Sequence, residues 1–170
     1  MPGTKPGTTA SVMEIKMAKP EDTLTLETTK GKVVIAMRPD LAPGHVARIK
    51  ELVKQGFYDG IVFHRVIDGF MAQTGCPQGT GMGGSGQKLK AEFNREPHVR
   101  GTVSMARAQD PNSGDSQFFI CFDDATFLDK QYTAWGNVIE GMENVDKIKR
   151  GEPVRDADKI IKATIAADAK

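Results

Sequence analysis

The sequence predicts a mainly β fold, in which about eight short antiparallel strands form a barrel that two helices cover. Three observations support this prediction. Short segments of apolar and β-branched residues recur between glycine-rich turns, and apolar residues follow helical spacing in only two segments. The 170 residues contain no internal repeat and suit one domain with its own core. A barrel would leave no exposed sheet edge, but these patterns alone do not distinguish a barrel from a sandwich.

The first expected element is a β-hairpin. Residues 23–28 alternate leucine with threonine, and residues 33–37 form a continuous apolar segment. The polar connection Thr29–Lys32, which contains a glycine, predicts the turn between them.

A helix is expected next, from Pro43 to Gly56. Proline is favoured at the first position of a helix, and glycine is favoured just after its end. The residues between them that recur at helical spacing are Val46, Ile49, Leu52 and Val53.

The following segment predicts a tight hairpin with an arginine among apolar residues. The expected strands are Ile61–Ile67 and Phe70–Thr74, and the Asp68-Gly69 pair between them suits a type I′ turn, in which both residues have positive φ. Arg65 must either reach water or face a cleft where its fixed donors bind a ligand, and we favour the cleft. His64 alternates with Arg65, so we expect it to be a hydrogen-bonded histidine in the interior.

The rest of the chain predicts short elements separated by loops. A glycine-rich loop covers Gly75–Gly86. A second helix is expected over Met142–Arg150, with basic residues in its last turn and Gly151 beyond it. The remaining expected strands are 101–106, 117–122, 134–139 and 160–165.

Charge and hydropathy favour no nucleic-acid or membrane partner. The 23 basic and 22 acidic residues nearly cancel, so no global field attracts nucleic acid or anionic lipid. No segment approaches the length of a membrane span, and the first residues lack the apolar core of a signal peptide.

The two cysteines and the amino-terminal segment give further expectations. Cys76 and Cys121 have no CxxC spacing, so we expect free thiols and a reducing, cytoplasmic compartment. Residues 1–19 are rich in Pro, Gly and Thr; we expect a disordered leader, in which Met13 could be a natural start, before a domain over 20–170.

Other site types have weak support. Gly79–Gly84 matches GxGxxG, but a nucleotide site needs a strand before the loop and a helix after it, and we expect a structural loop. His45, His64 and His98 are scattered and form no metal motif. No GxSxG motif supports a hydrolase, because Gln87 ends the nearest match.

Two blocks of sequence closely resemble the cyclophilins, the peptidyl-prolyl cis/trans isomerases. The first is residues 58–75, which contain Phe63-His64-Arg65, and the second is residues 115–121. The resemblance continues through residues 101–108, 127–129 and 135–139 and covers roughly 23–165. It is closest to the compact bacterial type, because familiar eukaryotic members usually carry asparagine, tryptophan and histidine at the positions of three residues here: Arg107, Phe127 and Tyr132.

The resemblance implies a closed eight-stranded antiparallel barrel capped by two α-helices, with the active site on its outer face. Arg65 is implied to be catalytic, with Phe63 beneath the site. Gln73 would orient Arg65 or bind the substrate backbone, and 106–108 would pair with the peptide backbone. The residues implied to bind substrate are Phe70, Met71, Gln73, Ala106, Arg107, Ala108, Gln117, Phe119, Phe127, Leu128 and Tyr132.

The implied activity is cis/trans isomerisation of X-Pro bonds in polypeptides, assisting protein folding, by a chain expected to be a monomer without cofactor or metal. Cyclosporin-type ligands should bind weakly, because Phe127 has no indole donor. Two rival interpretations remain: a non-catalytic proline-binding module on the same fold, and a nucleotide-binding protein, which a nucleotide would stabilise against heat.

Overall fold

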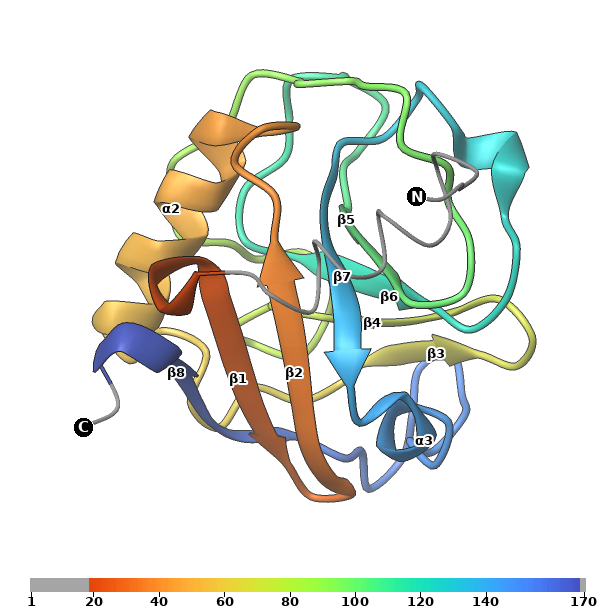
Figure 1. The fold of residues 1–170 in the computed structure, drawn as a ribbon. Coiled ribbons are helices and arrows are strands. Elements are labelled where there is room, and N and C mark those ends of the chain that lie inside the picture. The colour runs from red at the N-terminus through yellow and green to blue at the C-terminus, as the bar shows by residue number, and fades with distance from the viewer. Residues whose placement is uncertain (1–18, 169–170) are drawn as a thin grey trace, which may run out of the picture.

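The computed structural model describes residues 19–168, and its strands form a single antiparallel sheet (Figure 1). The sheet has eight strands in the order β3-β4-β6-β5-β7-β2-β1-β8. The predicted mainly β class is therefore confirmed. The expected leader lies outside the described residues, apart from Lys19. The strands are β1 (Thr23–Thr28), β2 (Gly31–Met37), β3 (Arg65–Ile67), β4 (Met71–Thr74), β5 (Thr102–Met105), β6 (Phe118–Cys121), β7 (Ala134–Glu140) and β8 (Ile160–Ile165).

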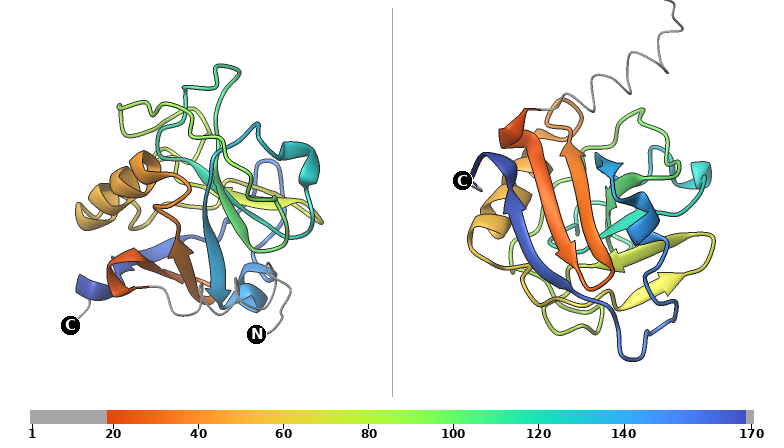
Figure 2. Two further views of the ribbon diagram at one scale, coloured as in Figure 1. Left: turned by 45° about the horizontal axis from the view of Figure 1, so that its top comes forward. Right: turned by 60° about the horizontal axis from the view of Figure 1, so that its bottom comes forward.

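The sheet is curled, and the expected closed barrel is not confirmed. Strands β3 and β8 are its two edges and do not pair with each other. The segments just before them approach instead, through an isolated bridge between Val62 and Lys159 and a 2.8 Å hydrogen bond from Phe63 N to Asp158 O. The outer edge of β3 pairs instead with the loop at Gly151, through an isolated bridge in which Val66 and Gly151 exchange two hydrogen bonds of 2.8 Å. Figure 2 shows the curl formed by β8, β1 and β2.

The helices lie at the sides of the curled sheet. Helix α2 (Pro43–Lys54) lies against β8, and the short helix α3 (Met142–Val145) lies beside β2 (Figure 1). Three 3-10 turns complete the structure: η1 (Pro20–Asp22), η2 (Thr126–Leu128) and η3 (Ala166–Asp168). The predicted caps of α2 are confirmed, since Pro43 starts the helix and Gly56, with φ +75°, follows its end.

The inward side chains of the sheet form the main core. In the middle of the sheet, Phe118 packs edge-on against Tyr58 and Trp135, with ring centroids 5.6 and 5.3 Å apart. Phe63 belongs to this core and not to the outer face, where the resemblance placed the site. The core therefore occupies one side of β4 and β6 and leaves their other side for a separate cluster.

The hairpin at Asp68 differs from the predicted type I′ geometry. Its strands, β3 and β4, are shorter than expected and are joined by three residues, because Ile67 pairs with Met71. Of the two predicted turn residues only Gly69 has positive φ, at +75°, and Phe70 N donates to Ile67 O. A single left-handed glycine at the third position is typical of a type II turn.

Helix α3 ends five residues before the predicted Arg150. After Val145 the chain continues in tighter turns, with Lys147 N bonded to Asn144 O at 3.1 Å. Lys149 N then donates to the Asp158 carboxylate at 2.8 Å instead of to a helical carbonyl. This long-range acceptor gives the backbone an alternative to the helix, which the local sequence does not reveal.

Candidate active site

The register of three neighbouring strands places the candidate site on the outer face of the sheet. Arg65 in β3 lies opposite Gln73 in β4, and Gln73 lies opposite Phe119 in β6. Side chains that are paired across strands share a face, whereas sequence neighbours point to opposite faces. The alternation therefore sends Val66 and Phe118 into the core and leaves Arg65, Gln73 and Phe119 together outside.

An apolar cluster separate from the main core forms on this face. Its buried members are Met71, Phe119, Cys121, Ala125 and Leu128. Three of them, Met71, Phe119 and Leu128, line a cavity of about 310 Å³, which is large enough for a small apolar group. Ten of the twelve residues predicted for the site line this cavity: Arg65, Phe70, Met71, Gln73, Ala106, Arg107, Phe119, Phe127, Leu128 and Tyr132. We call it the apolar pocket.

The apolar pocket has a buried floor and an exposed rim. Phe119 is only 4% exposed, and its ring packs edge-on against Tyr132 with centroids 5.8 Å apart. Phe127, in η2, is 67% exposed and leans on Phe70 at 5.7 Å. An exposed aromatic side chain beside a buried apolar floor provides contact area for a ligand.

The guanidinium of Arg65 is held at the polar side of the pocket by two partners. Its Nε donates to Oε2 of Glu152 at 2.9 Å, and its Nη1 donates to Oε1 of Gln73 at 3.3 Å. From the sequence Gln73 could either orient the arginine or bind substrate, and in the structure its amide oxygen accepts a hydrogen bond from the guanidinium. Glu152 was missed, because it lies 87 residues away in a loop with no local motif.

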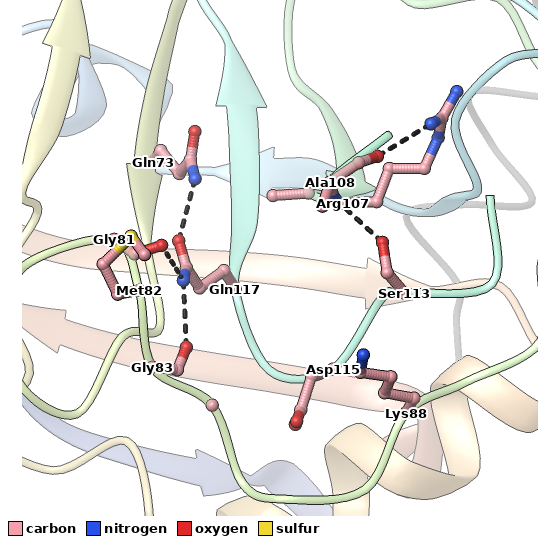
Figure 3. Close-up of a pocket in the computed structure, with 12 residues that line it drawn as sticks. Gln73, Gly81, Met82, Gly83, Lys88, Arg107, Ala108, Ser113, Asp115 and Gln117 are labelled. Atoms are coloured by element: carbon pink, nitrogen blue, oxygen red, sulfur yellow. Dashed lines mark hydrogen bonds between the residues drawn. The ribbon is translucent and has the colours of Figure 1, made fainter. Parts of the chain in front are cut away.

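Gln73 and Gln117 link the arginine to the glycine-rich loop. Gln73 Nε2 donates to Gln117 Oε1 at 2.9 Å, and Gln117 Nε2 donates to the carbonyls of Gly81 and Gly83, both at 2.9 Å (Figure 3). Each amide group thus has its oxygen and its nitrogen directed by a defined partner. The network therefore fixes the orientation of the Gln73 amide, with its oxygen directed toward Arg65.

Figure 3 shows the lining of a second, more polar pocket, which has a volume of about 300 Å³. It adjoins the first pocket, because both are lined by Gln73, Ala106 and Arg107. The two predicted residues absent from the apolar pocket, Ala108 and Gln117, line this one. Its remaining lining residues are Gly81, Met82, Gly83, Gly84, Lys88, Ser113 and Asp115. All twelve predicted site residues therefore lie along one continuous groove.

Arg107 has a structural role at the boundary of the two pockets. Its guanidinium lies 4.7 Å from the centre of the Tyr132 ring and donates to the carbonyls of Ala108 and Gln131 at 2.9 Å. The backbone N–H of Ala106 already donates to Gln117, and that of Ala108 donates to Ser113. In residues 106–108, which were expected to pair with the peptide backbone, these two N–H donors therefore already have partners.

The glycine-rich loop is organised around a cysteine rather than around a phosphate site. The Cys76 sulfur accepts hydrogen bonds from the N–H groups of Gly81 and Gly83, both at 3.2 Å. Burial raises the pKa of this thiol, but these backbone donors outweigh burial and lower the pKa to about 7. No helix follows the loop within residues 84–100, so the context of a nucleotide fingerprint is missing there.

The described histidines occupy separate buried positions. His64 is buried as predicted, but its Nδ1 has no hydrogen-bond partner among the described residues, so the predicted hydrogen bond is not found at that atom. Burial lowers its pKa, and Arg65 lowers it further. Within residues 19–168, no group of three or more His, Cys, Asp or Glu side chains is arranged to hold a metal ion. In the same range, no helix combines the length and the apolar character needed to cross a membrane.

Comparison with protein families and sequences gives consistent matches. Residues 23–167 match the family model described as "Cyclophilin type peptidyl-prolyl cis-trans isomerase/CLD". A probable peptidyl-prolyl cis-trans isomerase of Brucella suis is 53% identical over 177 residues, covering 94% of this chain and 90% of that protein. The peptidyl-prolyl cis-trans isomerase of Synechococcus elongatus is 44% identical over 144 residues, covering 85% of this chain and 96% of that protein.

Solved structures show the same similarity. The cyclophilin AquaCyp293 from Hirschia baltica is 32% identical, with a TM-score of 0.84, and the match covers 96% of this chain and 82% of that one. A cyclophilin-type isomerase of Cryptosporidium parvum, whose crystal structure was determined in the presence of the dipeptide Ala-Pro, is 28% identical, with a TM-score of 0.78. That match covers 84% of this chain and 98% of the other.

Proposed function

Because this chain belongs to the cyclophilin-type peptidyl-prolyl cis-trans isomerases, we propose that its apolar pocket holds the proline ring of an X-Pro peptide while Arg65 assists rotation about the X-Pro bond. The observation that carries this proposal is the position of Arg65. Its guanidinium lies on the rim of an apolar cavity that Phe119, Met71 and Leu128 line. The solved relative in the presence of Ala-Pro supports the same class of ligand.

Rotation about an X-Pro bond is slow because it breaks amide resonance, with a barrier of about 18–20 kcal/mol. No covalent bond has to be cleaved. In the twisted transition state the prolyl nitrogen becomes pyramidal and regains its lone pair. A hydrogen-bond donor directed at that nitrogen therefore binds the transition state more strongly than either planar ground state.

Arg65 can supply this donor without transferring a proton. The guanidinium has five N–H donors and stays protonated at any physiological pH. Glu152 accepts a hydrogen bond from Nε–H, and Gln73 accepts one from Nη1–H. The other N–H donors of Arg65 are therefore available for a ligand in the pocket. A general-acid role is excluded, because the group does not deprotonate.

The hydrogen bond from Arg65 accounts for part of the rate increase only. A hydrogen bond to a charged group contributes about 1.5–3 kcal/mol, which corresponds to about one to two powers of ten in rate. The pocket contributes further if it anchors the proline ring while the preceding carbonyl turns in the polar part of the groove. Equal binding of both states would not accelerate the rotation.

The groove also suggests how a longer peptide is placed. The second pocket adjoins the first at Gln73, Ala106 and Arg107, so residues that flank the proline would extend toward it. The carbonyls and the remaining N–H along 106–108 would contact the peptide backbone. We further propose a monomer that assists folding in a reducing, cytoplasmic compartment, a setting compatible with two buried free cysteines, Cys76 and Cys121.

Exchange spectroscopy on the unmodified protein tests this function. A tetrapeptide that contains Ala-Pro should show accelerated cis/trans exchange, and backbone resonances of Phe119, Leu128 and Gln73 should shift. The control peptide, with alanine in place of proline, should shift none of them at the same concentration. Exchange at the uncatalysed rate, or shifts confined to another surface, would contradict the proposal.

A further inference from the structure

We propose that His98 is a positioning residue, which holds the floor and the outer wall of the apolar pocket in the geometry that binds proline. The inference rests on the proposed function of that pocket. His98 does not line the cavity itself, but it contacts Phe119 in β6 and the two residues that flank the turn η2, which carries Phe127 and Leu128.

The imidazole of His98 is fully buried and has a partner at each nitrogen. Its Nδ1 lies 3.0 Å from Oδ1 of Asp129, and its Nε2 lies 2.8 Å from Oγ of Ser104 in β5. The ring stacks on Phe119, with centroids 6.2 Å apart and an angle of 25° between the planes. Ser104 is also the cross-strand partner of Phe119. The phenyl ring of the pocket floor is thus supported by a histidine whose own orientation is fixed at both ends.

The backbone of His98 holds the outer wall. Its N–H donates to the same oxygen of Asp129 at 2.7 Å, and its carbonyl accepts a hydrogen bond from Ala125 N at 2.8 Å. Ala125 and Asp129 are the residues directly before and after η2, the turn that carries Phe127 and Leu128. One residue therefore fixes both ends of the turn whose side chains close the pocket.

The serine, histidine and aspartate resemble a hydrolase triad in their order of contacts, but their burial excludes that chemistry. Ser104 is fully buried, so no substrate can reach its hydroxyl. Because the Asp129 carboxylate accepts a hydrogen from Nδ1, Nε2 of the neutral ring is an acceptor for the Ser104 hydroxyl. The arrangement is a chain of oriented hydrogen bonds that ends beneath Phe119.

Protonation of His98 would disturb this chain. A hydrogen on Nε2 would have to be donated to Ser104, whose own hydroxyl hydrogen would then lose its acceptor. Burial lowers the pKa of His98, and Asp129 and Glu96 oppose this effect, so the ring is neutral near pH 7. The Cys121 thiol in β6 also lies near Asp129; burial raises its pKa to about 12, so it stays uncharged.

The test compares His98→Asn with His45→Asn. Asparagine retains a donor near the position of Nδ1 but removes the ring and the contact to Ser104. His45 is a matched control, because it is equally buried, has its Nδ1 2.6 Å from the carboxylate of Glu92 and lines neither pocket. The measurements are kcat and KM for an Ala-Pro tetrapeptide by exchange spectroscopy, and its Kd by NMR titration.

We expect His98→Asn to raise KM and Kd at least about fivefold while kcat changes less than about twofold. His45→Asn should leave all three within about twofold. In the parent, KM should rise as the pH falls from about 7.5 to about 5, and this rise should be absent in His98→Asn. Unchanged KM and Kd in folded His98→Asn, or an equal rise in His45→Asn, would overturn the proposal.

Two controls keep the outcome decisive. If His98→Asn does not fold, the test uses Ser104→Ala, which removes the partner of His98 Nε2 and retains the imidazole ring. This variant should raise KM at least about threefold, and an unchanged KM would overturn the proposal. A parent protein that neither binds nor turns over the peptide would overturn the proposed function together with this inference. Normal turnover by the parent, with no effect in either variant, would overturn the inference alone.

Discussion

Replacing Glu152 by glutamine tests whether the orientation of Arg65 matters as well as its presence. Glu152→Gln retains the size of the side chain but replaces a carboxylate that lies 2.9 Å from Arg65 Nε. The amide would hold the guanidinium less firmly, because the attraction between two opposite charges is lost and only a hydrogen bond from a charged donor to a neutral acceptor remains. We expect the arginine to spend less time with its free donors directed at the pocket.

The structure sets the size of this effect. The Arg65 and Glu152 side chains are 39% and 59% exposed, and an exposed ion pair contributes only about 0–1 kcal/mol to stability. The midpoint of thermal unfolding should therefore barely change. If about half of a transition-state hydrogen bond worth about 1.5–3 kcal/mol is lost, kcat/KM should fall about three- to tenfold.

The assay is exchange spectroscopy on an uncharged Ala-Pro peptide, with Asp146→Asn as the matched control. Asp146 pairs with Arg100 at 2.6 Å, its side chain is also exposed, at 38%, and neither residue lines the groove. Activity of Glu152→Gln equal to or above that of the parent would refute the idea that this carboxylate orients Arg65. An equal loss in Asp146→Asn would show that general changes in charge cause the effect.

Three further outcomes are expected. Phe119→Ala should weaken peptide binding at least about tenfold. It should lower the free energy of unfolding, measured in urea, by less than the ~3–5 kcal/mol of a fully enclosed phenylalanine, because one side of its ring faces the pocket. A loss at the top of that range would place Phe119 in the core instead. Phe127→Trp should bind cyclosporin at least about tenfold more tightly than the parent, with little change in turnover. The reason is that the indole adds a hydrogen-bond donor and ring area at an exposed position of the rim. Nanomolar inhibition of the parent would contradict this. Burial lowers the pKa of His45 and of His98, although Glu92 and Asp129 oppose this effect. As the pH falls, these histidines therefore take up protons in the unfolded chain before they do so in the folded protein, and the free energy of unfolding should fall below about pH 6.5. Equal stability at pH 7 and pH 5 would contradict this.

The parts of the site that the sequence predicted depend on local periodicity and on the family resemblance. Strand alternation predicts that Arg65 and His64 face opposite sides. In the structure His64 is buried, whereas Arg65 is partly exposed opposite Gln73 on the outer face. The resemblance predicted that Phe119 and Leu128 lie near Arg65 in the site, and both residues line the apolar pocket with it. The family and the activity that the motifs implied are confirmed by the match over residues 23–167.

The parts that the sequence did not predict depend on contacts between distant segments. Glu152 reaches Arg65 across 87 residues, and Asp158 ends the second helix by accepting Lys149 N. Neither position carries a local pattern that separates it from an ordinary surface carboxylate. The curled sheet remains open at β3 and β8 for a similar reason, because ladder length depends on how the edges meet and not on propensity.

Arg65 is proposed to act on the transition state of the rotation rather than on peptide binding. Line-shape analysis of an Ala-Pro peptide titrated with Arg65→Ala gives the Kd and the rate of isomerisation on the protein separately. We expect the rate of isomerisation on the protein to be at least about tenfold lower than in the parent, with the Kd within about threefold and the thermal midpoint nearly unchanged. A tenfold rise in Kd with an unchanged rate on the protein would contradict it and would make Arg65 a binding residue.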